Sequence, residues 1–197
     1  MKVKGFIETV FLGEYREIVY KHRFHYISFS LIALGIEFLG ACIDEHHFGK
    51  TRQSGPRFRR AIQELFPPEY QRFINRGDYD LYKNLRNGFA HQFRPGSTVG
   101  LTHRAESARY GTEHLQIYNG QLILISEDLY EDFETACKKV IRKIDNRSIT
   151  HPKVDSSFLS LPQDRSPPVG EFDLSTKTDF SVGSAIADGF PYDVNDA

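Results

Sequence analysis

The chain has 197 residues, of which 40% are hydrophobic and 26% charged, and its formal net charge is −1. This length suits one domain of ordinary size plus an appendage, with enough apolar residues to bury a core. The charge is uneven: residues 1–145 carry 21 Lys and Arg against 18 Asp and Glu, while residues 146–197 carry 4 against 8. The basic excess at the front is small, but it favours an anionic partner there.

Membrane and secreted classes do not fit the sequence. The N-terminus, "MKVKGFIETVF", lacks a long apolar segment and a small-residue cleavage site. The longest apolar run, "SLIALGIEFLGACI", is too short to span a bilayer and is interrupted by Glu37. Cys42 and Cys137 lie in apolar helical patterns without C-x-x-C spacing and are interpreted as buried, reduced thiols. We expect a soluble, cytoplasmic protein that does not engage a membrane.

The first half of the chain is predicted to be helical. Apolar periodicity indicates helices over residues 6–20 and, as the central and most hydrophobic one, 23–46. A third helix is expected over 54–66, with a Pro in its first turn and two prolines after its end. Asp78 is expected to cap a fourth helix, which continues to a Pro-Gly stop at residue 95.

Strand signals follow the fourth helix. "EHLQIYNGQLILI", residues 113–125, has two alternating runs around Asn-Gly, a strong β-hairpin signal, and "STVGLTH" is a candidate third strand. Residues 127–144 carry an apolar stripe behind a Ser126 cap and should form the last helix. Residues 146–197, rich in Ser, Pro, Asp and Gly, are predicted to be mostly disordered. The predicted fold is mostly α, a helical bundle over residues 1–145 with a small β-hairpin insertion and an acidic tail.

Three short motifs are better explained without special chemistry. "GKT" at 49–51 lacks the first Gly of a phosphate-binding loop and follows a helix rather than a strand. "DEHH" at 44–47 offers metal ligands, but adjacent His side chains on a helix point about 100° apart, and cations are favoured at a helix C-terminus. "RGD" at 76–78 is explained by the Asp78 cap. We predict no metal site and no cofactor.

The stretch "LYKNLRNGFAHQFRPG", residues 81–96, carries the candidate chemistry. On a regular helix Asn87 and His91 share a face, whereas Arg86 and His91 diverge by roughly 140°. Both reach one phosphate if Arg86 bends or the helix loosens near Gly88; otherwise they are the polar flank of an ordinary core helix. Gly88 costs a helix about 1 kcal/mol relative to Ala, which indicates that something approaches the backbone there closely.

"LRNGFAHQ" resembles the signature of the HEPN superfamily (higher eukaryotes and prokaryotes nucleotide-binding domains). That signature is an Arg, a polar residue and then a His, on a late helix of a helical bundle. Arg86, Asn87 and His91 match the three positions, with four residues between the Arg and the His. The resemblance covers residues 5–145 loosely and implies a HEPN-like bundle, to which the hairpin between the motif helix and the last helix is an addition.

The resemblance implies a metal-independent endoribonuclease that cleaves single-stranded RNA by attack of a 2′-OH on its own phosphodiester, in a toxin or phage-defence role. His91 would act as general acid or base, and Arg86 would stabilise charge on the phosphate. Asn87 would bind the phosphate or position His91. Since one His does not readily serve both sides of the phosphorus, the resemblance also implies a homodimer with a composite active site.

Two further features fit this hypothesis, and each has a simpler alternative. Glu37, on a helix face of small and polar residues, either pairs with Arg86 or lies exposed at the helix rim. Five cations without an intervening acid form either an RNA-binding surface or an ordinary solvated face: Lys50, Arg52, Arg57, Arg59 and Arg60.

Two other functions stay open at this point. The first is a non-catalytic HEPN-like module that binds RNA, a nucleotide or a protein partner. The second is a structural helical protein whose acidic tail recruits a partner. A toxin would in addition have an antitoxin-like protein partner.

Overall fold

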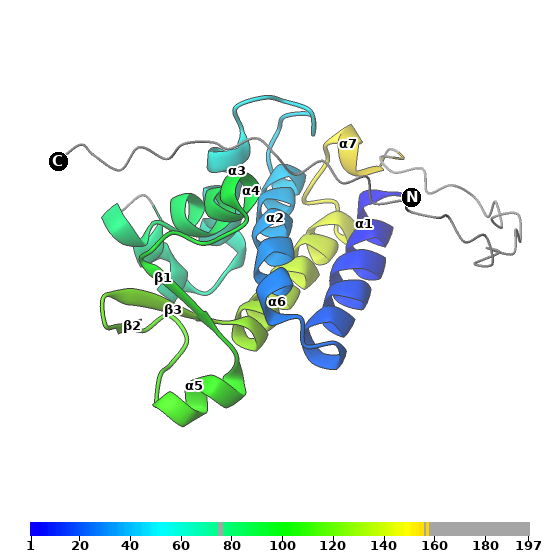
Figure 1. Cartoon of the computed structure of the whole chain (residues 1–197). Coiled ribbons are helices and arrows are strands. Elements are labelled where there is room, and N and C mark those ends of the chain that lie inside the picture. The colour runs from blue at the N-terminus through cyan, green and yellow to red at the C-terminus, as the bar shows by residue number, and fades with distance from the viewer. Residues whose placement is uncertain (75–76, 156, 158–197) are drawn as a thin grey trace, which may run out of the picture. The chain divides into compact units, whose positions relative to one another are not determined.

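A computed structural model describes residues 1–74, 77–155 and 157. These residues form a mostly helical domain with a small three-stranded sheet (Figure 1), which confirms the predicted mostly α class. Most of the predicted disordered tail, from residue 158 on, lies outside the described residues.

Three long helical segments form the centre of the bundle (Figure 1). The N-terminal segment consists of α1 (Val3–Phe6), η1 (Ile7–Glu14) and η2 (Glu17–Lys21), and its η parts have the wider i→i+5 bonding of a π-helix. It packs with α2 (His25–Ile43) and α6 (Ser126–Asp145). The stripe predicted on the last helix faces the core, with these side chains buried: Leu129, Phe133, Ala136 and Val140.

α2 is the core helix of the domain. Within the described residues it is the one helix long and apolar enough to cross a membrane. Its side chains Ile32, Ile36 and Leu39 are nevertheless at most 1% exposed, because they pack inside the bundle. α2 is thus packed as the core helix of this domain. α3 (Ser54–Leu65) crosses α2 so closely that a Cβ at Gly40 would collide with the α3 backbone.

The predicted hairpin is present, and the candidate third strand joins it. β2 (Ile117–Tyr118) pairs antiparallel with β3 (Gln121–Ile125), and β1 (Val99–Thr102) pairs parallel with β3 on its other side. The Asn-Gly turn at 119–120 has φ values of 48° and 75°, as a two-residue hairpin turn of this kind requires.

Two short helices lie outside the sequence prediction. α5 (Arg104–Tyr110) follows β1 and ends at Gly111, whose φ is 64°. α7 (Pro152–Asp155) packs onto the bundle with Val154 only 2% exposed. The folded domain therefore continues past the predicted boundary at residue 145, and the start of the predicted tail is part of the packed structure.

Two 3₁₀ turns connect α3 to the motif helix. They are η3 (Pro68–Phe73) and η4 (Gly77–Tyr79). The helix that follows is capped by Asp80, whose carboxylate accepts the backbone N–H of Lys83 at 3.0 Å. The predicted Asp78 cap is wrong by two residues, because residues 77–79 form their own turn first.

Candidate functional site

The motif helix carries the three matched residues and has two parts. η5 (Tyr82–Asn87) is π-helical and continues directly into α4 (Gly88–Gln92). π-helical turns are rare and occur frequently at functional sites. Arg86 and Asn87 lie in the widened part and His91 in the regular part, so the spacing of a uniform α-helix does not describe their relation. The predicted apolar line is buried: Leu81, Leu85 and Phe89.

Arg86 is held by polar partners from three elements. Its Nε–H donates to Glu37 Oε2 of α2 at 2.5 Å, and one Nη donates to Asn87 Oδ1 at 3.1 Å. The other Nη makes a longer bond of 3.5 Å to Ser54 Oγ at the start of α3. The predicted contact between Glu37 and Arg86 is thus confirmed, and it fixes the guanidinium between α2, α3 and the motif helix.

The Arg86–Glu37 pair is accessible as well as fixed. The side chains are 15% and 20% exposed, and both line a cavity of about 260 Å³. A guanidinium has five N–H donors, and these contacts use three of them, so within the described residues two stay available to a ligand. The remaining lining is mostly apolar and comes from α2, the loop after it and α3: Leu34, Phe38, Ala41, Phe48 and Arg57.

A tyrosine ring lies beside the pair and was not predicted as part of the site. The Tyr82 ring has the Arg86 Cζ 5.9 Å and the Arg59 Cζ 4.8 Å from its centroid. The negative face of an aromatic ring attracts a guanidinium, so Tyr82 stabilises both cations. Tyr82 is four residues before Arg86, and helical spacing places the two side chains in line, but it does not show that the ring belongs to the site.

His91 lies on the surface, in α4. It is exposed and makes no hydrogen bond or ion pair with another residue in the part of the chain that the structure describes. Arg86 likewise has no contact with His91 among its hydrogen bonds, all of which go to other residues. The single chain therefore joins Arg86, Asn87 and Glu37 into one cluster but does not bring His91 into it.

Gly88 has a structural explanation within this chain. After α4 the backbone turns at Phe93, with φ 54°, and residues 94–96 fold back along the motif helix. A Cβ at Gly88 would collide with the carbonyl oxygen of Arg94. The predicted close approach at Gly88 is confirmed, and the approaching group is the chain's own backbone.

The predicted basic cluster is divided by the structure. Arg57 is 5% exposed, and its guanidinium binds the Asp44 carboxylate at 2.6 Å and two backbone carbonyls of the loop after α2. Arg57 is therefore part of a structural ion pair, and its guanidinium does not belong to an exposed basic surface. Arg59 is partly buried and pairs with Asp80 at 3.2 Å. Three cations are exposed: Lys50, Arg52 and Arg60.

An apolar surface lies near the motif helix and also escaped the sequence prediction. Tyr26 donates its O–H to the Phe93 carbonyl at 2.6 Å, so the start of α2 lies against the end of α4. Residues on both elements leave large apolar side chains exposed by 43–62%: Phe24, Tyr26, Ile27, Leu34 and Phe93. Exposed apolar groups gathered beside a polar cluster are typical of an interaction surface.

Comparisons with known protein families, curated proteins and solved structures found no match. The HEPN resemblance therefore depends on the motif residues and on their place in this fold.

Proposed function

We propose that the protein is a metal-independent endoribonuclease that cleaves single-stranded RNA with Arg86, Asn87 and His91. The observation that carries the proposal is the Arg86–Glu37 ion pair, 2.5 Å long, at the edge of the cavity between α2 and the motif helix. An acid that orients an arginine at an accessible cavity is the arrangement that a phosphate site needs, because the guanidinium fork is then aimed before the ligand arrives.

Arg86 would bind the scissile phosphate with its two available N–H groups. The hydroxyl of Ser54 and the side-chain amide N–H of Asn87, two residues that already contact Arg86, would donate further hydrogen bonds to the phosphate oxygens. Arg52 lies two residues before Ser54, and Lys50 lies in the same loop. Both cations are exposed and would bind the flanking phosphates of the RNA.

His91 would transfer the proton in the cleavage step. An imidazole can act as base toward the 2′-OH or as acid toward the leaving 5′-oxygen. Since His91 of one protomer is not joined to its own Arg86, the proposal includes a homodimer in which two motifs share one cleft. The exposed apolar residues at the start of α2 and the end of α4 are the surface we assign to the partner copy.

A toxin or phage-defence role in the cytoplasm follows as the proposed setting, with an antitoxin-like protein as a partner that would cover the same cleft. The function is tested with purified protein on single-stranded RNA in EDTA. We expect fragments that end in 2′,3′-cyclic phosphate and begin with 5′-OH. Absence of cleavage on any RNA tested would refute it.

The alternative is a non-catalytic module that binds RNA, a nucleotide or a protein. The observation in its favour is that Arg86 already has three polar partners while His91 has none in the described part of the chain. A gel-shift measurement separates the two functions, because the module would bind RNA, lose binding in Arg86→Ala and leave the RNA intact.

A further inference from the structure

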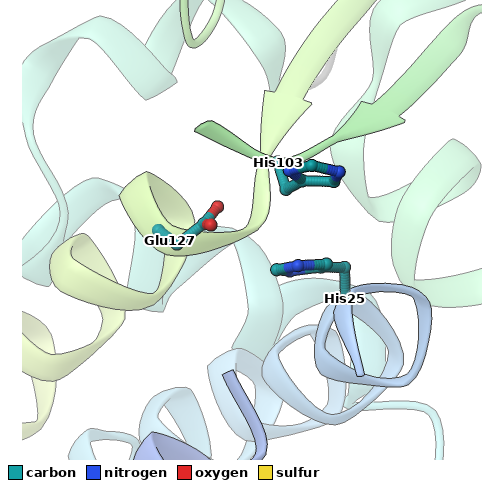
Figure 2. Close-up of side chains that lie close together, drawn as sticks. All are labelled: His25, His103 and Glu127. Carbon is teal, nitrogen blue, oxygen red and sulfur yellow. The ribbon is translucent and has the colours of Figure 1, made fainter. Parts of the chain in front are cut away.

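A second cluster of ionisable side chains lies away from the motif helix. His25 opens α2, His103 stands between β1 and α5, and Glu127 is in the first turn of α6. One ligand atom of each lies within 4.8 Å of the others (Figure 2). His25 and Glu37 are twelve residues apart on α2, about 18 Å along the helix, so this cluster is separate from the Arg86 cavity.

Hydrogen bonds already orient two of the three side chains. His25 Nδ1 is 2.8 Å from Ser126 Oγ, and the Ser126 hydroxyl donates to Glu127 Oε2 at 2.8 Å. With its only hydroxyl proton on Glu127, Ser126 accepts from His25, so Nδ1 carries the proton and Nε2 has the free lone pair. A metal-binding His commonly donates its other N–H to a fixed oxygen in this way. Ser126 therefore provides the oxygen that accepts the His25 N–H, and it does not cap the helix as the sequence predicted.

The carboxylate has one oxygen left for a ligand. Glu127 Oε2 accepts the Ser126 hydroxyl and the backbone N–H of Arg104, and the other oxygen has no bond to another described residue. The Arg104 guanidinium is turned away from the cluster, since it binds Asp128 at 2.5 Å and Glu131 at 2.6 Å. The acids of the α6 first turn offset the positive end of the helix dipole.

We propose that His25, His103 and Glu127 bind one divalent transition-metal ion of the zinc type, which ties the sheet insertion to the helical bundle. Two imidazole nitrogens and one carboxylate oxygen form a set that zinc uses, with a fourth position open to water. Zinc ligands in a tetrahedron lie about 3.3 Å apart, so the present spacing, within 4.8 Å, must close by at most about 1.5 Å. The two imidazoles are stacked, with centroids 4.5 Å apart and planes at 17°, and binding turns at least one ring until its nitrogen faces the ion.

The test uses the full chain after removal of metals with a chelator. Titration calorimetry with ZnCl₂ should give one ion per chain, and CoCl₂ should give the visible absorption of a tetrahedral site. With zinc at about 100 times its dissociation constant, the thermal midpoint should rise by roughly 5–10 °C.

Two variants and a matched control decide the outcome. His103→Ala and Glu127→Gln should each weaken zinc binding by roughly 10–100-fold or more. The double variant His46→Ala/His47→Ala removes two exposed histidines elsewhere and should bind zinc as the wild type does. The proposal is wrong if the wild type takes up no stoichiometric zinc, if either ligand variant binds it equally well, or if the control loses binding.

Discussion

Glu37 and Arg86, 49 positions apart in the sequence, form a 2.5 Å ion pair between the core helix α2 and the motif helix. The pair has two consequences. It attaches the motif helix to the bundle, and it holds the guanidinium in place at the lining of the adjacent cavity. An arginine with free rotation would lose side-chain entropy when it binds a phosphate, and the pair removes part of that cost beforehand.

Glu37→Gln should reduce RNA cleavage while the fold persists, because the amide keeps a hydrogen bond but no longer orients a charge. Glu37→Ala should in addition destabilise the domain by about 1–3 kcal/mol, since it leaves a mostly buried guanidinium without its acid. Urea unfolding and RNA cleavage measure the two effects. Glu64→Ala is the matched control: its pair with Arg60 is exposed and should be worth less than about 1 kcal/mol.

Gly88→Ala should destabilise the protein even though Ala is the better helix former. The new methyl group collides with the carbonyl of Arg94, and the shift this forces should cost about 1–3 kcal/mol. Gly13 is the control, because a Cβ there has its nearest neighbour at 3.6 Å, and Gly13→Ala should be neutral or stabilising by up to about 1 kcal/mol. Equal unfolding midpoints for the two variants would contradict the described course of residues 94–96.

A buried network joins the sheet insertion to the bundle. The backbone N–H of Ile125 donates to His114 Nδ1 at 2.9 Å, so the proton of the neutral ring is on Nε2. Nε2–H then donates to the Tyr70 hydroxyl at 2.8 Å, and Tyr70 donates to Asp132 at 2.7 Å. Burial lowers the pKa of His114 from 6.5 to about 4.

This depressed pKa predicts a loss of stability in mild acid. Below pH 6.5 His114 is protonated in the unfolded chain, whereas in the folded protein it stays neutral down to about pH 4. The contribution of His114 to the free energy of unfolding is therefore complete above pH 6.5 and declines as the pH falls. By pH 5 the loss should be about 2 kcal/mol. Urea unfolding at pH 7.5 and pH 5 should show a smaller decline in His114→Gln than in the wild type. Equal declines would contradict the network.

The dimer hypothesis predicts the behaviour of Leu34→Glu. Leu34 is 43% exposed on the surface assigned to the partner copy, so a charge there should give a folded monomer with little RNA cleavage. Ile117→Glu is the control, because Ile117 is 51% exposed on β2, away from that surface. Light scattering after size exclusion measures the mass. An unchanged mass in Leu34→Glu would contradict the assigned interface.

Much of the fold could be predicted from the sequence because local signals and the final packing agree. The Asn-Gly turn specified its hairpin, and the 3.6-residue stripe of α6 specified its buried face. The π-helical parts could not be predicted, because the same apolar residues fit an i→i+4 or an i→i+5 bonding pattern. The boundary at residue 145 was placed too early because α7 is a single turn whose contacts come only from tertiary packing.

Part of the candidate site could also be predicted from the sequence, and part of it could not. A lone acid in an apolar helix left two interpretations of Glu37, a pair with Arg86 or an exposed position at the helix rim, and the structure contains the pair. Arg57 could not be told from its neighbours by charge, since its burial depends on Asp44, thirteen positions earlier. His25 and His103 gave no signal because they are far apart in the sequence and meet only in the fold.

The most direct test of the central claim is single-stranded RNA cleavage by His91→Ala in EDTA, beside the wild type and His46→Ala. Because the His91 side chain is exposed, its variant should fold as the wild type does and have the same mass in solution. We expect cleavage to fall by at least about 100-fold in His91→Ala and to be unchanged in His46→Ala. Cleavage that survives in His91→Ala, with the same 2′,3′-cyclic phosphate ends, would contradict the account.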